Sequence, residues 1–211
     1  MAVEIELKAW VDDPCALKTK INAIAEYKTA YTKEDIYYIS DPNAAAKNTL
    51  PISGVRIRTE TVCDAQHNES TTVLVTYKTK ELRNKIEIND EKEFAICDIK
   101  RESTEQSAII FEDLLQRLGL IRGVCKKKVG KLWKKDSINV ELSLVENLGT
   151  FLELEIIVEQ GSDSATIEKS RNQLLNFLSL CGISQNKIEP RYYAEMLKGL
   201  SANETNSAIE Q

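Results

Sequence analysis

The chain has 211 residues, of which 42% are hydrophobic and 29% are charged, and its formal net charge is −5. This balance is typical of a globular protein and gives no indication of binding to nucleic acid or to a membrane. No apolar run reaches the roughly 20 residues of a membrane span, and the first residues carry no secretory signal pattern. The five cysteines are scattered and form no CxxC pair, which predicts reduced thiols in a cytoplasmic protein.

Strand-like runs dominate the chain and are interrupted by amphipathic helices. In chain order the runs predict strands at 3–10, 35–40, 54–60, 72–79, 91–98, 122–134, 137–144 and 150–159. Helices are predicted to begin at Asp13-Pro14, to cover about 105–118 and 163–181, and to form a short piece near 190–198. Loops are predicted at 42–53 and 61–71. We therefore expect one domain over residues 1–200 and a polar, disordered tail over 201–211.

Charged and apolar side chains alternate along these strands. In the first strand, Glu4, Glu6 and Lys8 share one face, because every second side chain of a strand points the same way. The same parity gives other strands a charged face, with Arg56 and Arg58, Lys78, Glu91 and Glu93, Lys126 and Lys128, Glu141, and Glu153 and Glu155. Most of these clusters carry one sign, whereas a face that only contacts water tends to mix polar residue types.

The helices decide which face of the strands is inside. An antiparallel sheet with one wet face explains any single strand. Each helix, however, has an apolar stripe that needs an apolar sheet face to cover. If the helices cover the apolar face, the charged face lies inside whatever the sheet encloses, and about eight strands can close into a barrel. We therefore predict an α+β fold: an eight-stranded antiparallel closed barrel with a charged interior and helices outside.

A charged interior of this kind needs a charged ligand. Like charges about 5 Å apart repel by ~3 kcal/mol at an effective dielectric constant near 20. Carboxylate clusters without His or Cys suit a hard divalent cation, Mg²⁺ or Mn²⁺. Paired arginines and several lysines suit phosphate oxygens. A metal-bound polyphosphate satisfies both demands and indicates phosphoryl chemistry, although the chain has no glycine-rich P-loop.

Several motifs follow one another in a recognisable order. They are "EIELK" at 4–8, "GVRIRTE" at 54–60, "TYK" at 76–78, "EKEF" at 91–94, "CKKK" at 125–128, "LGTFLELE" at 148–155 and "YYAEML" at 192–197. In this order the chain resembles the CYTH superfamily, the triphosphate tunnel metalloenzymes, over about residues 3–197. In length and motif layout it is most similar to the bacterial members that resemble class IV adenylyl cyclases.

The resemblance implies a tunnel fold, a triphosphate substrate and a role for each charged residue. The metal ligands would be Glu4, Glu6, Glu153 and Glu155, with Glu6 and Glu155 as the preferred direct ligands. The triphosphate would be bound by Lys8, Arg56, Arg58, Lys78, Lys126 and Lys128. The catalytic candidates are Lys8, Glu93 and Glu141.

Two positions depart from the family pattern. Members often carry K-x-R where this chain has Lys126-Lys127-Lys128, which leaves the register of that strand open. Many also carry an Asp at the position of Ser143, and Glu141 either replaces it or is a solvated acid. Tyr193 either closes one end of the tunnel or has only a packing role.

Two reactions fit the same tunnel. An adenylyl cyclase would convert ATP to cyclic AMP and pyrophosphate, and the resemblance places this reaction first. The alternative is a triphosphatase that hydrolyses inorganic, nucleoside or thiamine triphosphate. A non-catalytic polyphosphate- or nucleotide-binding module is a third option, which the carboxylate pairs disfavour. The physiological substrate, the choice between Mg²⁺ and Mn²⁺ and the oligomeric state, including a homodimer, stay open.

Overall fold

The structure is a computed structural model that describes residues 2–40, 53–64, 68–96 and 104–200. Several sequence-based predictions therefore lie outside the described residues. They concern most of the loop at 42–53, the end of the strand predicted at 91–98, and the tail at 201–211.

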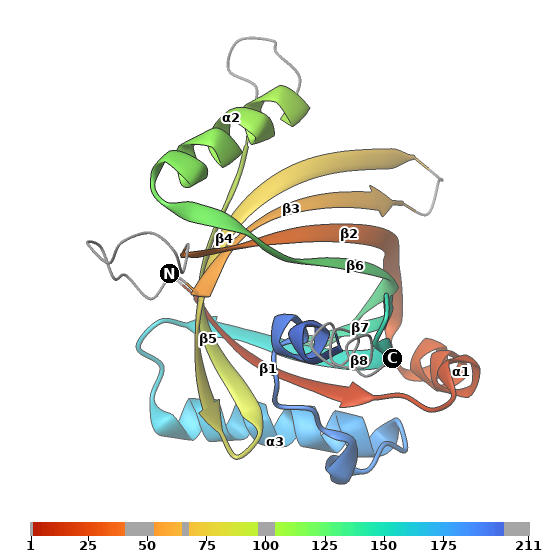
Figure 1. Cartoon of the computed structure of the whole chain (residues 1–211). Helices are drawn as coiled ribbons and strands as arrows, with labels where there is room; N and C mark the ends of the chain where they lie inside the picture. Colours follow the sequence, from red (N-terminus) through yellow and green to blue (C-terminus); the bar gives the residue numbers. More distant parts are fainter. Residues whose placement is uncertain (1, 41–52, 65–67, 97–103, 201–211) are drawn as a thin grey trace, which may run out of the picture.

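Eight antiparallel strands close into a barrel, as predicted (Figure 1). Around the barrel the order is β1, β5, β4, β3, β2, β6, β7 and β8, and β8 pairs back onto β1. The strands are β1 (Ala2–Trp10), β2 (Glu26–Ser40), β3 (Ser53–Cys63), β4 (Glu69–Arg83), β5 (Ile86–Ala95), β6 (Leu120–Lys135), β7 (Ile138–Val145) and β8 (Gly149–Glu159). The helices are α1 (Pro14–Ile24), α2 (Thr104–Arg117), α3 (Ser164–Leu180), a short 3-10 helix η1 (Gln185–Lys187), and a helical piece at 193–200.

Local sequence signals explain where helices and turns form. Asp13 caps α1 by accepting a hydrogen bond from the Ala16 amide at 2.9 Å, and Pro14 is the first helical residue, as predicted. Asp163 caps α3 in the same way, with 2.8 Å to the Thr166 amide. β4 and β5 form a hairpin around Asn84 and Lys85, whose φ angles of 51° and 66° are those of a two-residue turn that matches strand twist.

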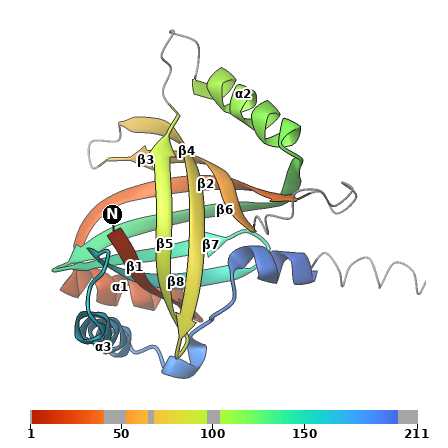
Figure 2. The ribbon, with the colours of Figure 1, turned by 90° about the vertical axis from the view of Figure 1, so that its left-hand side faces the viewer.

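The main apolar core lies outside the barrel wall. The outward side chains of β1, such as Ile5 and Leu7, are fully buried under α3 and α1, and Leu152 and Leu154 of β8 join them. Figures 1 and 2 show α3 running along this side of the barrel. The inward side chains are consequently the charged ones, since alternate residues point to opposite faces.

The other two helical pieces have different positions. α2 contacts β4 and β6, and its Leu115 is buried in a second apolar cluster with Tyr38 and Ile57. The helix at 193–200 lies at one mouth of the barrel, where Tyr193 and its neighbours line the interior cavity (Figures 1 and 2).

The predicted strand and loop bounds need three corrections. β2 begins at Glu26 rather than at 35. The sequence did not predict the first part of this strand, because residues 26–34 mix Lys, Thr and Tyr without clean alternation. β5 begins at Ile86 rather than at 91, directly after its hairpin turn. The loop predicted at 61–71 is also shorter, since β3 continues to Cys63 and β4 begins at Glu69.

Two further observations concern membrane spans and cysteines. Within the part of the chain that the structure describes, no helix is long and apolar enough to cross a membrane. Cys15, Cys63, Cys125 and Cys181 are free thiols.

Replacement of an outward apolar side chain tests this inverted arrangement. Leu154 is fully buried in the outer core, so Leu154→Ala should lower the free energy of unfolding by about 2–5 kcal/mol. Urea denaturation measures this change. Ile157 on the same strand is 54% exposed, and Ile157→Ala should stay within about 0.5 kcal/mol of the parent protein. Equal effects of the two variants would contradict the assignment of the core to the outside of the barrel.

Candidate functional site

The interior of the barrel is a cavity of about 490 Å³. All of the site residues predicted from the sequence line it, namely Glu4, Glu6, Lys8, Arg56, Arg58, Lys78, Glu93, Lys126, Lys128, Glu141, Glu153 and Glu155. The strand register explains their meeting, because Glu6 lies opposite Glu155 and Lys8 lies opposite Glu153 between β1 and β8.

Opposite charges gather on opposite sides of this cavity. β2, β3 and β6 carry a basic wall, which consists of Lys33, Arg56, Arg58, Lys126 and Lys128. β1, β5 and β8 carry an acidic wall, which consists of Glu4, Glu6, Glu87, Glu91, Glu93, Glu153 and Glu155. Lys8 and Lys78 stand among the carboxylates of the acidic wall.

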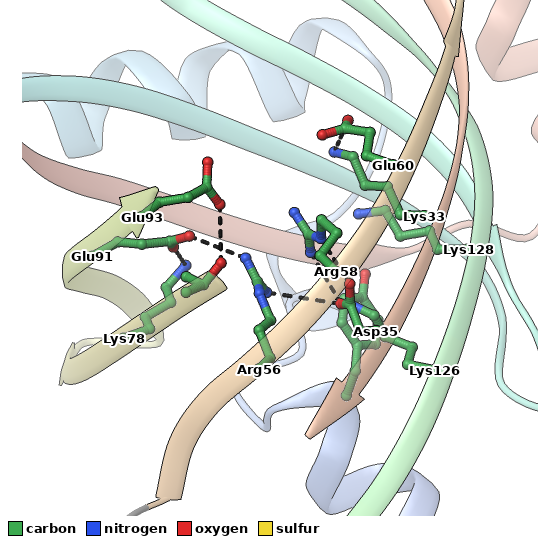
Figure 3. A network of polar contacts seen from close by, with 12 residues as sticks. Lys33, Asp35, Arg56, Arg58, Glu60, Lys78, Glu91, Glu93, Lys126 and Lys128 are labelled. Atoms are coloured by element: carbon green, nitrogen blue, oxygen red, sulfur yellow. Dashed lines mark hydrogen bonds and ion pairs between the residues drawn. The ribbon is translucent and has the colours of Figure 1, made fainter. Parts of the chain in front are cut away.

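Asp35 of β2 holds the basic wall together (Figure 3). Its carboxylate accepts hydrogen bonds from Arg58 Nε and Nη2 at 2.7 and 3.0 Å. Lys126 Nζ lies 2.8 Å from it and Arg56 Nη1 lies 3.8 Å from it. Burial alone would raise the pKa of Asp35, but Lys126 and Arg58 outweigh it and hold that pKa well below its ordinary value.

Arg56 connects the two walls. Its Nη2 donates to Glu91 Oε1 at 3.0 Å, across the cavity from Asp35 (Figure 3). Its Nε atom is buried and has no hydrogen-bond partner within the described part of the chain. Since a buried donor without an acceptor is costly, Arg56 has a spare donor for an anionic ligand.

Lys78 is the main counter-charge of the acidic wall. Its ammonium group lies 3.0 Å from Glu4, 3.0 Å from Glu6 and 3.2 Å from Glu91. Although burial disfavours the charged form, these carboxylates raise the pKa of Lys78 well above its ordinary value. One ammonium group therefore serves three carboxylates and cannot neutralise all of them.

The remaining negative charge falls on Glu4 and Glu155. Burial, together with Glu91, Glu155 and Glu6, raises the pKa of Glu4 to about 7 against the opposing effect of Lys78. Burial and then Glu6 raise the pKa of Glu155 to about 7. In Glu6, by contrast, Lys78 and Lys8 outweigh burial and lower the pKa to about 2.

This carboxylate set fits a hard divalent cation. Glu4, Glu6 and Glu155 offer only oxygen atoms, and their mutual repulsion favours a bound cation. Asn89 Oδ1 is buried beside Glu6 and has no hydrogen-bond partner among the described residues, so another oxygen is available there. The described His, Cys, Asp and Glu side chains nevertheless form no group of three or more arranged to hold a metal ion, and Lys78 lies between Glu4 and Glu6.

A second network surrounds Lys128. Glu141 accepts hydrogen bonds from Tyr31 and from Lys33, the latter at 3.1 Å, and pairs with Lys128. Lys128 and Lys33 outweigh the effect of burial and lower the pKa of Glu141 far below its ordinary value. Glu141 therefore points into the cavity rather than into solvent. Its role as a replacement for an Asp at position 143 stays a prediction.

Hydrogen bonds and ion pairs also hold the remaining predicted residues in position. Lys8 is buried and donates to Glu87 at 2.8 Å. Glu93 is exposed to the cavity and accepts a hydrogen bond from Thr76 at 3.0 Å. Lys126 and Lys128 both point inward whereas Lys127 is exposed beside Glu34, which settles the register of β6. The fork geometry of an arginine is accordingly absent at position 128.

Some residues of this site did not emerge from the sequence. Lys33 and Asp35 share the inward parity of β2, but the strand was predicted to start at 35. Glu87 was missed because it precedes the predicted start of its strand. Extending both strands back by parity would have found Lys33 and Glu87, whereas Asp35 is the first residue of the predicted strand.

Removal of the Asp35 charge should destabilise the protein. In Asp35→Asn, Arg58 and Lys126 lose their shared counter-charge in a buried place, so we expect a loss of about 3–5 kcal/mol in the free energy of unfolding. Chemical denaturation measures the loss. The neighbouring Glu34 forms an exposed pair with Lys127, and Glu34→Gln should change stability by less than about 1 kcal/mol. A similar small change in both variants would show that Asp35 has no such role.

Solved structures with the same architecture exist in other organisms. A Pyrococcus horikoshii protein superposes with a TM-score of 0.70 at 25% sequence identity, and the match covers 93% of this chain and 98% of that one. A Vibrio parahaemolyticus protein named "putative adenylate cyclase" superposes with a TM-score of 0.67 over 92% of this chain and 97% of that one. At 19% identity, this second match supports the fold alone.

Sequence comparison points in the same direction. A Methanocaldococcus jannaschii protein named "Putative adenylate cyclase" is 26% identical over 200 residues, which span 94% of this chain and 99% of that protein. The CYTH domain profile matches residues 2–193. Members of that family bind triphosphate substrates, commonly process them, and typically depend on a metal. Because this profile covers all eight strands of the barrel, the chain belongs to the CYTH domain family.

Proposed function

We propose that the chain is a divalent-metal-dependent enzyme that converts ATP to cyclic AMP and pyrophosphate inside the barrel. The observation that carries this proposal is the opposition of the two walls across one cavity. The acidic wall has more carboxylate charge than Lys78 neutralises, and the basic wall includes a spare buried donor on Arg56. A metal-bound triphosphate meets both needs, since its oxygens accept from the basic wall and its metal contacts the carboxylates.

The residues of the two walls would divide the work. Arg56, Arg58, Lys126 and Lys128 would bind phosphate oxygens and neutralise their charge, with Asp35 fixing three of these side chains. Glu4, Glu6 and Glu155 would hold the cation, which supplies further charge neutralisation when bound. Glu153 is less suited to that task because it already accepts hydrogen bonds from Lys128, Ser143 and Tyr193.

The two catalytic carboxylate candidates suit different roles. Glu141 is surrounded by three donors and has a lowered pKa. It would therefore hold Lys128 in position rather than accept a proton. Glu93 accepts a hydrogen bond from the Thr76 hydroxyl, has no ion pair within the described part of the chain, and faces the cavity. Glu93 would thus be the better acceptor for the proton of the attacking ribose hydroxyl.

The lining of the cavity favours a nucleotide over inorganic triphosphate. Beside the basic wall, Tyr37, Ile39 and Val124 contribute an aromatic and aliphatic surface. Inorganic triphosphate has no group that would use such a surface, whereas a nucleoside has a base and a sugar to place there. The names of the archaeal and Vibrio relatives agree with this choice but do not establish it for this chain.

Product analysis tests the proposed reaction directly. The purified protein is incubated with ATP or with tripolyphosphate in the presence of Mg²⁺ or Mn²⁺, and the products are separated. Cyclic AMP and pyrophosphate are the expected products. Release of orthophosphate from either substrate would show that the chain is a triphosphatase and not a cyclase. If neither substrate is turned over and phosphate binding is insensitive to a chelator, the chain is a binding module and the proposal is wrong.

Loss of one metal-ligand candidate should remove the metal-dependent activity. In Glu6→Gln a carboxylate ligand becomes a neutral amide, and we expect the turnover at saturating metal to fall by about 100-fold or more. Steady-state rates over a Mn²⁺ titration measure the effect. The matched control is Glu81→Gln, which neutralises an exposed carboxylate at the far end of β4 and should retain the parent rate. Full activity of Glu6→Gln would exclude Glu6 as a ligand.

The acidic wall should also give the metal-free protein an unusual pH dependence. Glu4 and Glu155 bind protons more tightly in the folded chain than in the unfolded chain, so their contribution to stability is present near pH 4.5 and is lost as pH rises through about 7. Because both side chains are partly exposed and share Lys78, we expect a loss of about 2 kcal/mol, or ~4–8 °C in Tm.

A thermal melt series with a chelator measures this fall. Addition of Mg²⁺ or Mn²⁺ at pH 7.5 should reverse it, because the cation neutralises the ionised pair. Glu155→Gln should flatten the same profile. A Tm that is constant from pH 5 to 7.5, with or without metal, would contradict the metal assignment.

A further inference from the structure

The segment that follows η1 is fastened to the end of β1. Ile188 forms a β-bridge with Ala9, and the Glu189 amide donates to the Lys8 carbonyl at 2.9 Å. The Glu189 carboxylate accepts hydrogen bonds from Trp10 Nε1 at 3.2 Å and from the Arg191 side chain at 2.7 and 2.9 Å. This attachment places the following residues at the mouth of the barrel.

Tyr193 enters the cavity from this segment. It is 7% exposed and packs against Phe151 in an edge-on geometry, with 5.0 Å between ring centroids. Val145 and Met196 complete the apolar cluster around it. Its hydroxyl donates to Glu153 Oε1 at 2.9 Å, so both ends of the side chain are fixed.

Three ammonium groups gather around the Tyr193 ring. The Nζ atoms of Lys126, Lys8 and Lys128 lie 4.9, 5.3 and 5.7 Å from the ring centroid. These lysines come from β6 and β1, which are not neighbours in the barrel. Their carboxylate partners also differ: Asp35 for Lys126, Glu87 for Lys8, and Glu153 with Glu141 for Lys128. Within these interactions, the Tyr193 ring is the element common to all three.

Three like charges around one ring form a site for an anion. The negative face of an aromatic ring attracts ammonium groups at these distances and so opposes their mutual repulsion. Each lysine also has its own carboxylate partner, so the ring is the contact through which the positions of the three ammonium groups depend on one another.

We infer that Tyr193 is a positioning residue that sets the spacing of Lys8, Lys126 and Lys128 for one phosphate group of the substrate. This inference rests on the proposed function, because it presumes a triphosphate in the cavity. It assigns the C-terminal segment a part in substrate binding beyond the closure of one end of the barrel. The ring is the functional element, and the hydroxyl serves to orient it against Glu153.

Two substitutions separate the ring from the hydroxyl. Tyr193→Phe keeps the ring and should bind inorganic tripolyphosphate within about threefold of the parent protein, whereas Tyr193→Leu should bind about tenfold more weakly. Isothermal titration calorimetry with tripolyphosphate and a chelator measures both affinities without turnover. In steady-state assays with metal, Tyr193→Leu should raise KM with little change in kcat. Tyr193→Phe should have the KM of the parent protein.

Met196→Ala controls for general loosening of the segment. Met196 packs in the same apolar cluster as Tyr193, and its side chain carries no aromatic ring that could attract the three ammonium groups. This variant should lose thermal stability but keep the parent affinity for tripolyphosphate. If Met196→Ala weakens binding as much as Tyr193→Leu does, the role of Tyr193 is only structural and the inference fails.

The outcomes also separate this inference from the proposed function. Unchanged affinity in a folded Tyr193→Leu variant, with binding by the parent protein, would overturn the inference alone. Absence of tripolyphosphate binding by the parent protein, with and without metal, would overturn both.

Discussion

The pairing of opposite charges inside the barrel is the constraint on which the rest of the structure depends. A charged side chain leaves water at a large cost unless a partner of opposite charge and suitable hydrogen bonds replace it. Lys8 is 4% exposed and Asp35 is 1% exposed, and each has such a partner. The apolar faces of the strands are free to pack outward on α1 and α3 only because the inward faces are satisfied in this way.

The same pairing explains how an interior of this kind can still bind a ligand. Asp35 is shared among several cations and Lys78 among several carboxylates, so neither wall is neutralised one-to-one. A metal-bound phosphate group would exchange one set of ionic partners for another, which costs less than taking charges from water into an apolar pocket. The raised pKa values of Glu4 and Glu155 show where unbalanced negative charge is greatest, and a bound cation would stabilise the protein most at that place.

Strand parity made most of the fold and the site predictable, because a period of two residues is a local property of the sequence. It placed Glu6 and Glu155 on the same inner surface, but it could not distinguish them. They are register partners, yet the pKa of Glu6 falls to about 2 and that of Glu155 rises to about 7. The difference depends largely on Lys78, whose ammonium group contacts Glu6 from β4, a strand far away in the sequence. Asp35 was missed for a different reason, since the next residues of its parity, Tyr37 and Ile39, are uncharged and no cluster of charges marked that face.

The order of side chains along β6 bears on the choice between the two reactions. Val124, Lys126 and Lys128 point inward in succession, about 6–7 Å apart, and Tyr37 lies beside Lys126. On the proposed function, a nucleoside against Val124 and Tyr37 would put its α-phosphate nearest to Lys126 and its terminal phosphate toward Lys128 and Lys33. Cyclisation attacks the α-phosphorus, beside the uncharged surface, whereas hydrolysis of the terminal phosphate attacks at the far end, beside Glu141. The two reactions therefore make demands on different stretches of one strand, and the presence of Tyr37, Ile39 and Val124 next to Lys126 is the reason to place the chemistry at the α-phosphorus.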